Sequence, residues 1–98
     1  MKEIRFDWDL WNVQKNEQKH GVSALEAESC FYDDKARIFE DLKHATRNEN
    51  RFVLYGKGLE NRVLMVGFTL RKSKVRIITA RPASRKERKV YEEKTSRN

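Results

Sequence analysis

The stretch VLMVGFTLRKSKVRIITARP, residues 63–82, decides the fold. Its first eight residues are almost continuously apolar, which is typical of a central strand that is covered on both faces. The polar residues 71–74 predict a hairpin turn, and residues 75–81 predict the next strand. Pro82 is expected to end that strand, because proline has no amide hydrogen to donate to a neighbouring strand. The stretch therefore predicts an antiparallel hairpin at the centre of a sheet.

Further strands are predicted on the N-terminal side of this hairpin, over residues 36–40 and residues 51–55. The sequence Gly-Lys-Gly at residues 56–58 predicts the turn that leads into the central strand. Near the start of the chain, residues 4–8 alternate between apolar and polar side chains, and this alternation predicts another short strand.

Three helices are predicted from capping signals: residues 10–20, a helix that opens at the capping box of residues 23–26, and a terminal helix from the capping box of residues 84–87 to about residue 94. Asp9 is expected to cap the first helix and Gly21 to end it. Asp33 and Asp34 are expected to end the second helix. The order of strands and helices indicates an α+β domain, in which an antiparallel sheet is flanked by N-terminal helices and a C-terminal helix.

The composition is that of a small protein with a thin core. Only 38% of the 98 residues are hydrophobic, and an equal 38% are charged. No apolar run approaches the length of about 20 residues that a transmembrane helix needs, and the N-terminal segment lacks the apolar centre of a signal peptide. Cys30 is the single cysteine, so neither an intrachain disulfide nor a cysteine-based metal site is expected. We therefore expect a soluble cytoplasmic protein with one domain, residues 1–98.

The positive charge is concentrated in the last third of the chain. Lysine and arginine number 22 against 15 acidic residues, which gives a net charge of +7. Residues 1–70 hold 11 basic and 12 acidic side chains, a net of −1, whereas residues 71–98 hold 11 basic and 3 acidic ones, a net of +8. Such asymmetry indicates a polyanionic partner such as nucleic acid, and the basic segment lacks the apolar face that a membrane anchor needs. A solvated basic tail is the alternative.

Two groups of residues are candidates for chemistry on a phosphate ester. Lys19 and His20 end the first helix, where the helix dipole favours a protonated imidazole, although the position of His20 alone favours a cap that ends the helix. Arg51, Arg76 and Arg81 lie on predicted strands, where an arginine can bind a phosphate with two nitrogens. Because Arg76 and Arg81 are five positions apart, a regular strand would place them on opposite faces.

The terminal helix carries basic residues where its own stability does not explain them. Arg85 and Lys86 occupy the first turn, at the positive end of the helix dipole, and a phosphate bound there would offset the cost. Glu87 could simply close the capping box, and Tyr91 could simply anchor the helix to the sheet.

The sequence contains no recognisable metal-binding or nucleotide-binding signature. His20 and His44 are the only histidines, and no His-x-x-x-His motif or cysteine pair is present. Asp7 and Asp9 could face one side of a strand, but Asp9 is better explained as a helix cap. The Gly-Lys-Gly sequence is too short to cradle a nucleotide phosphate. Neither a metal nor a cofactor is expected.

The chain resembles the BrnT family of toxins, and the resemblance covers nearly its whole length. The N-terminal half matches in Phe6-x-Trp8-Asp9 and in Lys19-His20-Gly21-Val22-Ser23 followed by Glu26-Ala27 and Phe31. The C-terminal half matches in Glu49-x-Arg51 before Gly56, in residues 76–81 with Ala83, and in Glu87-Arg88-x-x-Tyr91. The resemblance implies a RelE-like fold and a ribonuclease toxin that inhibits translation and growth. It also implies a small ribbon-helix-helix antitoxin, BrnA, which neutralises the toxin and makes the DNA contacts of their complex.

We therefore predict metal-independent cleavage of RNA, in which the 2′-OH of the substrate is the nucleophile. The protein must supply a base, an acid and positive charge near the phosphorus atom. The catalytic candidates are Lys19, His20, Arg51, Arg81, Glu87 and Tyr91. The candidates for binding the RNA backbone are Arg76, Arg85, Lys86, Arg88 and Lys89. A heterotetramer with the antitoxin is expected, because ribbon-helix-helix proteins dimerise.

Two other classes of function remain open from the sequence. The basic C-terminal third would also serve a non-catalytic module that binds nucleic acid. The terminal helix, which has few apolar residues, would also serve a module that only docks a partner protein.

Overall fold

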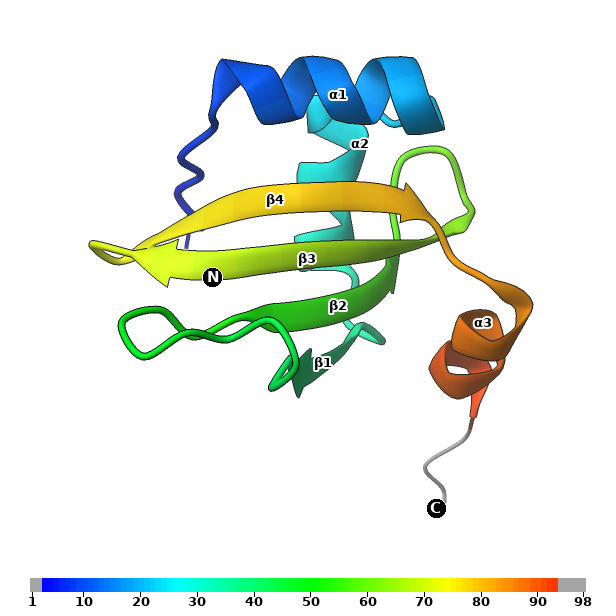
Figure 1. Ribbon diagram of the computed structural model, residues 1–98. Coiled ribbons are helices and arrows are strands. Elements are labelled where there is room, and N and C mark those ends of the chain that lie inside the picture. Colours follow the sequence, from blue (N-terminus) through cyan, green and yellow to red (C-terminus); the bar gives the residue numbers. More distant parts are fainter. Residues whose placement is uncertain (1–2, 94–98) are drawn as a thin grey trace.

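A four-stranded antiparallel sheet forms the centre of the computed structural model, which describes residues 3–93 (Figure 1). Its strands follow one another in the order β1 (Arg37–Glu40), β2 (Phe52–Lys57), β3 (Val63–Arg71) and β4 (Lys74–Pro82). The helices are α1 (Leu10–His20), α2 (Ala24–Ser29), the short 3-10 helix η1 (Cys30–Tyr32) and α3 (Arg85–Glu92). The predicted α+β class and the antiparallel sheet are confirmed. Within the described residues, no helix is both long enough and apolar enough to cross a membrane.

The hairpin of β3 and β4 forms where the sequence predicts it. Lys72 and Ser73 have φ values of 52° and 66°. Two consecutive left-handed residues are the mark of a type I′ turn, whose twist suits an antiparallel pair. Pro82 is the last residue of β4, as expected from its missing amide hydrogen.

Local capping signals fix the helix boundaries. The Asp9 side chain accepts a hydrogen bond from the Trp11 amide, and Gly21 ends α1 in the left-handed conformation with a φ of 67°. At α3, the Ser84 hydroxyl accepts from the Glu87 amide while the Glu87 carboxylate accepts from the Ser84 amide. The predicted bounds of α1 and the capping box of α3 are therefore confirmed. The predicted end of α3, about residue 94, lies outside the described residues.

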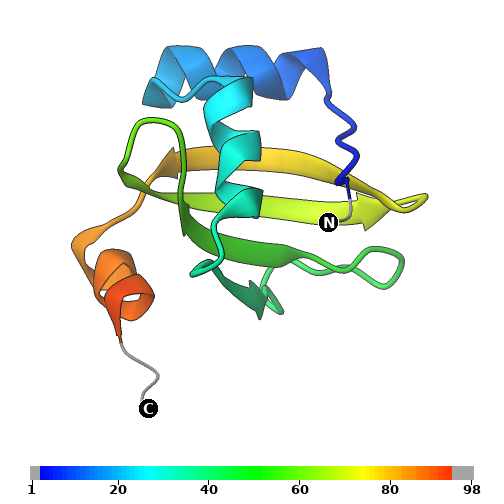
Figure 2. The same cartoon turned by 180° about the vertical axis from the view of Figure 1, so that it is seen from behind.

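The N-terminal helices cover only one face of the sheet. Figure 2 shows α2 crossing this face, with α1 lying along the β4 side, whereas Figure 1 shows the opposite face free of the N-terminal helices. Along β3, Leu64 and Val66 are fully buried while Met65 and Gly67, which point the other way, are half-buried. The prediction of a central strand covered on both faces is therefore wrong, because the short helices suffice for one face only.

Residues 4–8 do not form a strand, contrary to the prediction from their alternation. Phe6 makes a single parallel bridge to Val75, with hydrogen bonds from the Asp7 amide to the Val75 carbonyl and from the Val75 amide to the Arg5 carbonyl, each 2.8 Å long. The apolar side chains of the segment, Ile4, Phe6 and Trp8, pack against the core. The alternation thus reflects a segment that lies along β4 with one side buried.

The predicted turn at residues 56–58 is also wrong, because Gly56 and Lys57 belong to β2. A Cβ atom on Gly56 would lie 2.9 Å from the Cys30 carbonyl oxygen and 2.8 Å from Leu54 Cδ2. Glycine is needed here for the close approach of β2 to η1 rather than for a turn.

We expect Gly56→Ala to lower the free energy of unfolding by about 1–3 kcal/mol, because the added methyl group would overpack this contact. Urea unfolding measures the change. Lys57→Ala, at the exposed next position, is the control and should stay within about 0.5 kcal/mol of the wild type. An unchanged midpoint for Gly56→Ala would contradict the close contact between β2 and η1.

Candidate functional site

The uncovered face of the sheet, here called the open face, is the candidate functional site. Residues paired directly across antiparallel strands point to the same face. The pairing register therefore places two rows of side chains on the open face. The central row consists of Arg37, Tyr55, Met65 and Arg81, and the second row consists of Phe39, Val53, Gly67 and Thr79.

A β-bulge in β4 brings Arg76 and Arg81 onto this same face. The register shifts between Gly67 and Phe68, so that Ile78 is left without a partner. Beyond the bulge Arg76 pairs with Thr69, which shares its face with Met65, the partner of Arg81. The prediction of opposite faces is therefore wrong, because the extra residue in β4 reverses the alternation between the two arginines.

The strongest ion pair of the open face joins Arg81 to Glu87. Two guanidinium nitrogens of Arg81 donate to the two carboxylate oxygens of Glu87 at 2.9 and 2.8 Å. These hydrogen bonds hold the pKa of Glu87 below its ordinary value and raise the pKa of Arg81. Because the side chain of Arg81 is still 34% exposed, the pair presents an oriented and permanent cation to solvent.

Arg51 and Arg76 are paired with carboxylates as well. Arg51 Nε lies 3.4 Å from Glu49 Oε1, and Arg76 lies 3.2 Å from Asp7 Oδ2. All three arginines that the sequence singles out are therefore held in place and partly exposed. An anion on the open face would meet guanidinium groups whose positions are already fixed.

Tyr55 lies between these charges and an aromatic neighbour. Its ring centroid is 5.5 Å from that of Phe39, and Arg37 Cζ lies 5.9 Å from the Phe39 centroid. Burial raises the pKa of the Tyr55 phenol, and the nearby charge of Glu87 raises it further. Tyr55 and Phe39 were missed by the sequence analysis, although the two-residue alternation in their strands places them with the arginines.

A hollow of about 150 Å³ lies on the open face beside the loop that precedes β2. The side chains that line it include Arg51, Val53, Met65 and Thr79, together with Asp41 and His44 from the loop. His44 Nδ1 lies 2.9 Å from Asp41 Oδ2. His44, which the sequence analysis treated only as an isolated histidine, thus borders the candidate site.

The remaining predicted residues lie away from the two rows. Lys19 and His20 end α1, which runs along the β4 side of the sheet (Figure 1). Tyr91 donates a hydrogen bond to Asp33 at 2.7 Å, which joins α3 to the segment after η1. The other basic candidates, Arg85, Lys86, Arg88 and Lys89, are exposed on α3. Within residues 3–93, no hydrogen bond or ion pair joins Lys19, His20 or Tyr91 to Arg51, Arg81 or Glu87.

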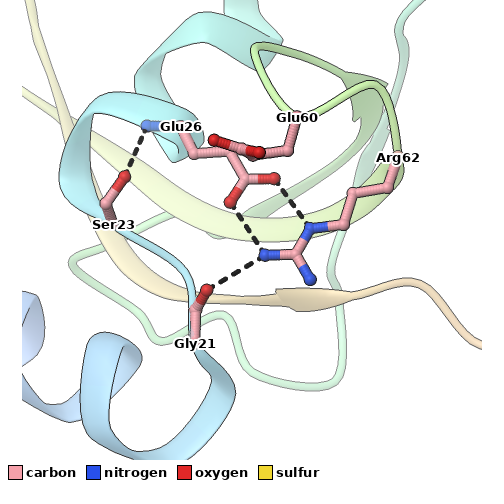
Figure 3. A pocket seen from close by; sticks show the side chains of 5 residues that line it. All are labelled: Gly21, Ser23, Glu26, Glu60 and Arg62. Atoms are coloured by element: carbon pink, nitrogen blue, oxygen red, sulfur yellow. Dashed lines mark hydrogen bonds and ion pairs between the residues drawn. The ribbon is translucent and has the colours of Figure 1, made fainter.

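A second hollow, on the other side of the molecule, has a structural role. Figure 3 shows Arg62 facing Glu26, with hydrogen bonds of 2.8 and 2.9 Å to the carboxylate and one of 3.0 Å to the Gly21 carbonyl. Ser23 accepts from the Glu26 amide, so only half of the predicted capping box forms, and the carboxylate binds Arg62 instead. The ion pair between Glu26 and Arg62 thus joins the first turn of α2 to the residue that precedes β3.

No group of three or more histidine, cysteine, aspartate or glutamate side chains that could hold a metal ion is found within residues 3–93. Cys30 is buried in the core, and burial raises the pKa of its thiol to about 12. A thiol with so high a pKa stays protonated and is a poor nucleophile or metal ligand.

Comparisons with known proteins agree with this fold. Residues 8–87 match the family model described as ribonuclease toxin, BrnT, of type II toxin-antitoxin system. Among solved structures, the chain is similar to the 1.1 Angstrom-resolution crystal structure of the Brucella abortus ribonuclease toxin, BrnT, with a TM-score of 0.61 and 22% sequence identity. That match covers 85% of this chain and 100% of the other. No curated protein matches the chain.

We expect Arg62→Met to lower the free energy of unfolding by about 1–3 kcal/mol, because the Glu26 carboxylate loses its charged partner in a buried position. Only 3% of the Glu26 side chain is exposed. Adding Glu26→Gln to the variant should recover part of the loss, since the stranded charge is removed. Urea unfolding of both variants checks this, and a stable Arg62→Met variant would contradict a structural role for the pair.

Proposed function

The chain belongs to the BrnT family of ribonuclease toxins of type II toxin–antitoxin systems, and from that premise we propose that the open face binds and cleaves RNA. The family implies ribonuclease activity, with RNA as the substrate and an antitoxin as the partner. We propose the surface that binds RNA, the mechanism of cleavage and the type of antitoxin from the arguments below.

The observation that carries the proposal is that three arginines share the open face. The bulge at Ile78 turns Arg76 and Arg81 to it, and Arg51 lines its hollow. Arginine binds phosphate with two parallel hydrogen bonds, and carboxylate partners orient its side chain before the substrate arrives. The aromatic pair of Phe39 and Tyr55 lies on the same face. Unpaired RNA bases stack on such aromatic side chains.

The proposed reaction needs no metal ion. The 2′-oxygen of the RNA attacks the adjacent phosphorus atom, the bond from phosphorus to the 5′-oxygen breaks, and a 2′,3′-cyclic phosphate and a 5′-OH result. Arg81 stabilises the negative charge that develops on the phosphate oxygens. Its raised pKa keeps it cationic throughout, so proton transfer must come from another group. Glu87, whose pKa is lowered, stays ionised at neutral pH and orients Arg81.

The sequence also proposes Lys19, His20 and Tyr91 for proton transfer or for orienting the arginines. These three residues contribute to cleavage only if the bound RNA extends beyond the open face. The exposed side chains of α3 that carry positive charge, Arg85, Lys86, Arg88 and Lys89, are proposed to hold the RNA backbone. Their charge supports a salt-dependent affinity for a polyanion.

We also propose that the antitoxin is a ribbon-helix-helix protein that covers the same face as the RNA, the open face, and forms a heterotetramer with two copies of this chain. The support is the family membership and the concentration of charge in residues 71–98. DNA would then be contacted by the antitoxin. A measured mass of one copy of each protein would contradict the heterotetramer.

We expect Arg81→Ala to lower the rate of RNA cleavage by about 10²-fold or more, because a fixed cation near the reacting phosphate is lost. Arg5→Ala, which removes one exposed positive charge from the segment before α1, is the control for the loss of charge alone and should cleave at nearly the wild-type rate. Cleavage should survive EDTA, and an RNA with 2′-deoxyribose at the cleaved position should stay intact. Full activity of Arg81→Ala would overturn the open face as the site. Products with 5′-phosphate ends would overturn the mechanism.

A further inference from the structure

We propose that His44 is the general base of RNA cleavage and that Asp41 is the residue that positions it. The inference rests on the proposed function, because it names the group on the open face that takes the proton of the attacking 2′-OH. Three other groups placed on this face are unsuited to that step: Arg81 stays cationic, Tyr55 has a raised pKa, and the lowered pKa of Glu87 makes it a weak base.

The geometry of the pair is that of an oriented imidazole. His44 Nδ1 lies 2.9 Å from Asp41 Oδ2, and because a carboxylate only accepts hydrogen bonds, the nitrogen of the ring that faces it is the donor. The neutral ring then carries its lone pair on Nε2, which is the form that can accept a proton. The side chain of Asp41 is 22% exposed and that of His44 is 62% exposed, so the orienting group is the more buried one and the imidazole is accessible.

The pair also borders the place where a phosphate would bind. Asp41 and His44 line the hollow of about 150 Å³ together with Arg51 and Thr79. Arg51 supplies a guanidinium group, and Asp41 is tied to the neighbouring backbone by a hydrogen bond of 2.8 Å from its amide to the Arg51 carbonyl. A base, its orienting carboxylate and a cation for the phosphate therefore surround one hollow.

The proposed step balances without an additional reagent. Nε2 of His44 takes the proton of the 2′-OH while the bond from the 2′-oxygen to phosphorus forms. The bond from phosphorus to the 5′-oxygen breaks, and this oxygen takes a proton from water. The imidazolium then returns its proton to solvent, which restores the neutral ring for the next reaction.

The test measures kcat/KM against pH for purified toxin with an RNA substrate. A histidine base gives an acidic limb to this profile, because a protonated ring cannot take the proton of the 2′-OH. The other ionisable groups that line the hollow are Asp41 and Arg51. Variants are therefore needed to show which group causes the acidic limb.

We expect His44→Ala to lower the rate by about 10²–10⁴-fold and to remove the acidic limb, with affinity for uncleavable 2′-O-methyl RNA unchanged. Added imidazole should restore part of the rate. Asp41→Asn should lower kcat and leave KM nearly unchanged, because the ring loses its orientation. Lys43→Ala, at an exposed position of the same loop, is the control for local disturbance.

Three results would overturn the proposal: an unchanged rate in His44→Ala, an acidic limb that persists in it, or a limb that His20→Ala removes instead. Circular dichroism and thermal melting establish that each variant is folded, so a rate is compared only between folded proteins. The Arg81→Ala assay remains a separate test. If Arg81→Ala is inactive while His44→Ala cleaves normally, the result supports the open face as the site of cleavage and contradicts the role of His44 as the base.

Discussion

The covering of one sheet face, and of one face only, is the constraint on which the rest of this structure depends. Leu54, Leu64, Val66 and Ile77 are the largest side chains that the sheet contributes to the fully buried part of the core, which the N-terminal helices cover. α1 and α2 contain 11 and 6 residues, which suffice to cover one face. The opposite face carries side chains that are mostly only partly buried, and several of these are charged or aromatic.

The open face gains its charge from an irregularity of the same sheet. A regular β4 would turn Arg76 and Arg81 to opposite faces, and the extra residue Ile78 turns them to one. Carboxylates from three different segments then hold the arginines in place, at some cost in net positive charge. The guanidinium groups are thereby oriented in advance, so less conformational entropy would be lost when an anion binds to them.

Local signals in the sequence were sufficient for α1 and for the start of α3, and distant pairings were not predictable from it. Asp9 and Gly21 bound α1 through contacts within a few residues, which is why its range could be read directly. The bulge at Ile78 depends on how β4 pairs with β3, and Gly56 was mistaken for a turn because its contact with η1 is a tertiary one. The family resemblance identified the class of protein, but the resemblance and the spacing of residues left His44 unassigned because its neighbours in the hollow come from other strands.

The claim that RNA binds to the open face is tested most directly by the methyl resonance of Met65. Met65 lies between Tyr55 and Arg81 in the central row, and the chain contains 2 methionines in all. Toxin labelled at its methionine and leucine methyl groups is titrated with uncleavable 2′-O-methyl RNA, and the methyl resonances of Leu25, exposed on α2, are followed as the reference. The account predicts that the Met65 resonance shifts and saturates while those of Leu25 stay in place. A stationary Met65 resonance, with shifts confined to the helix-covered side, would contradict it.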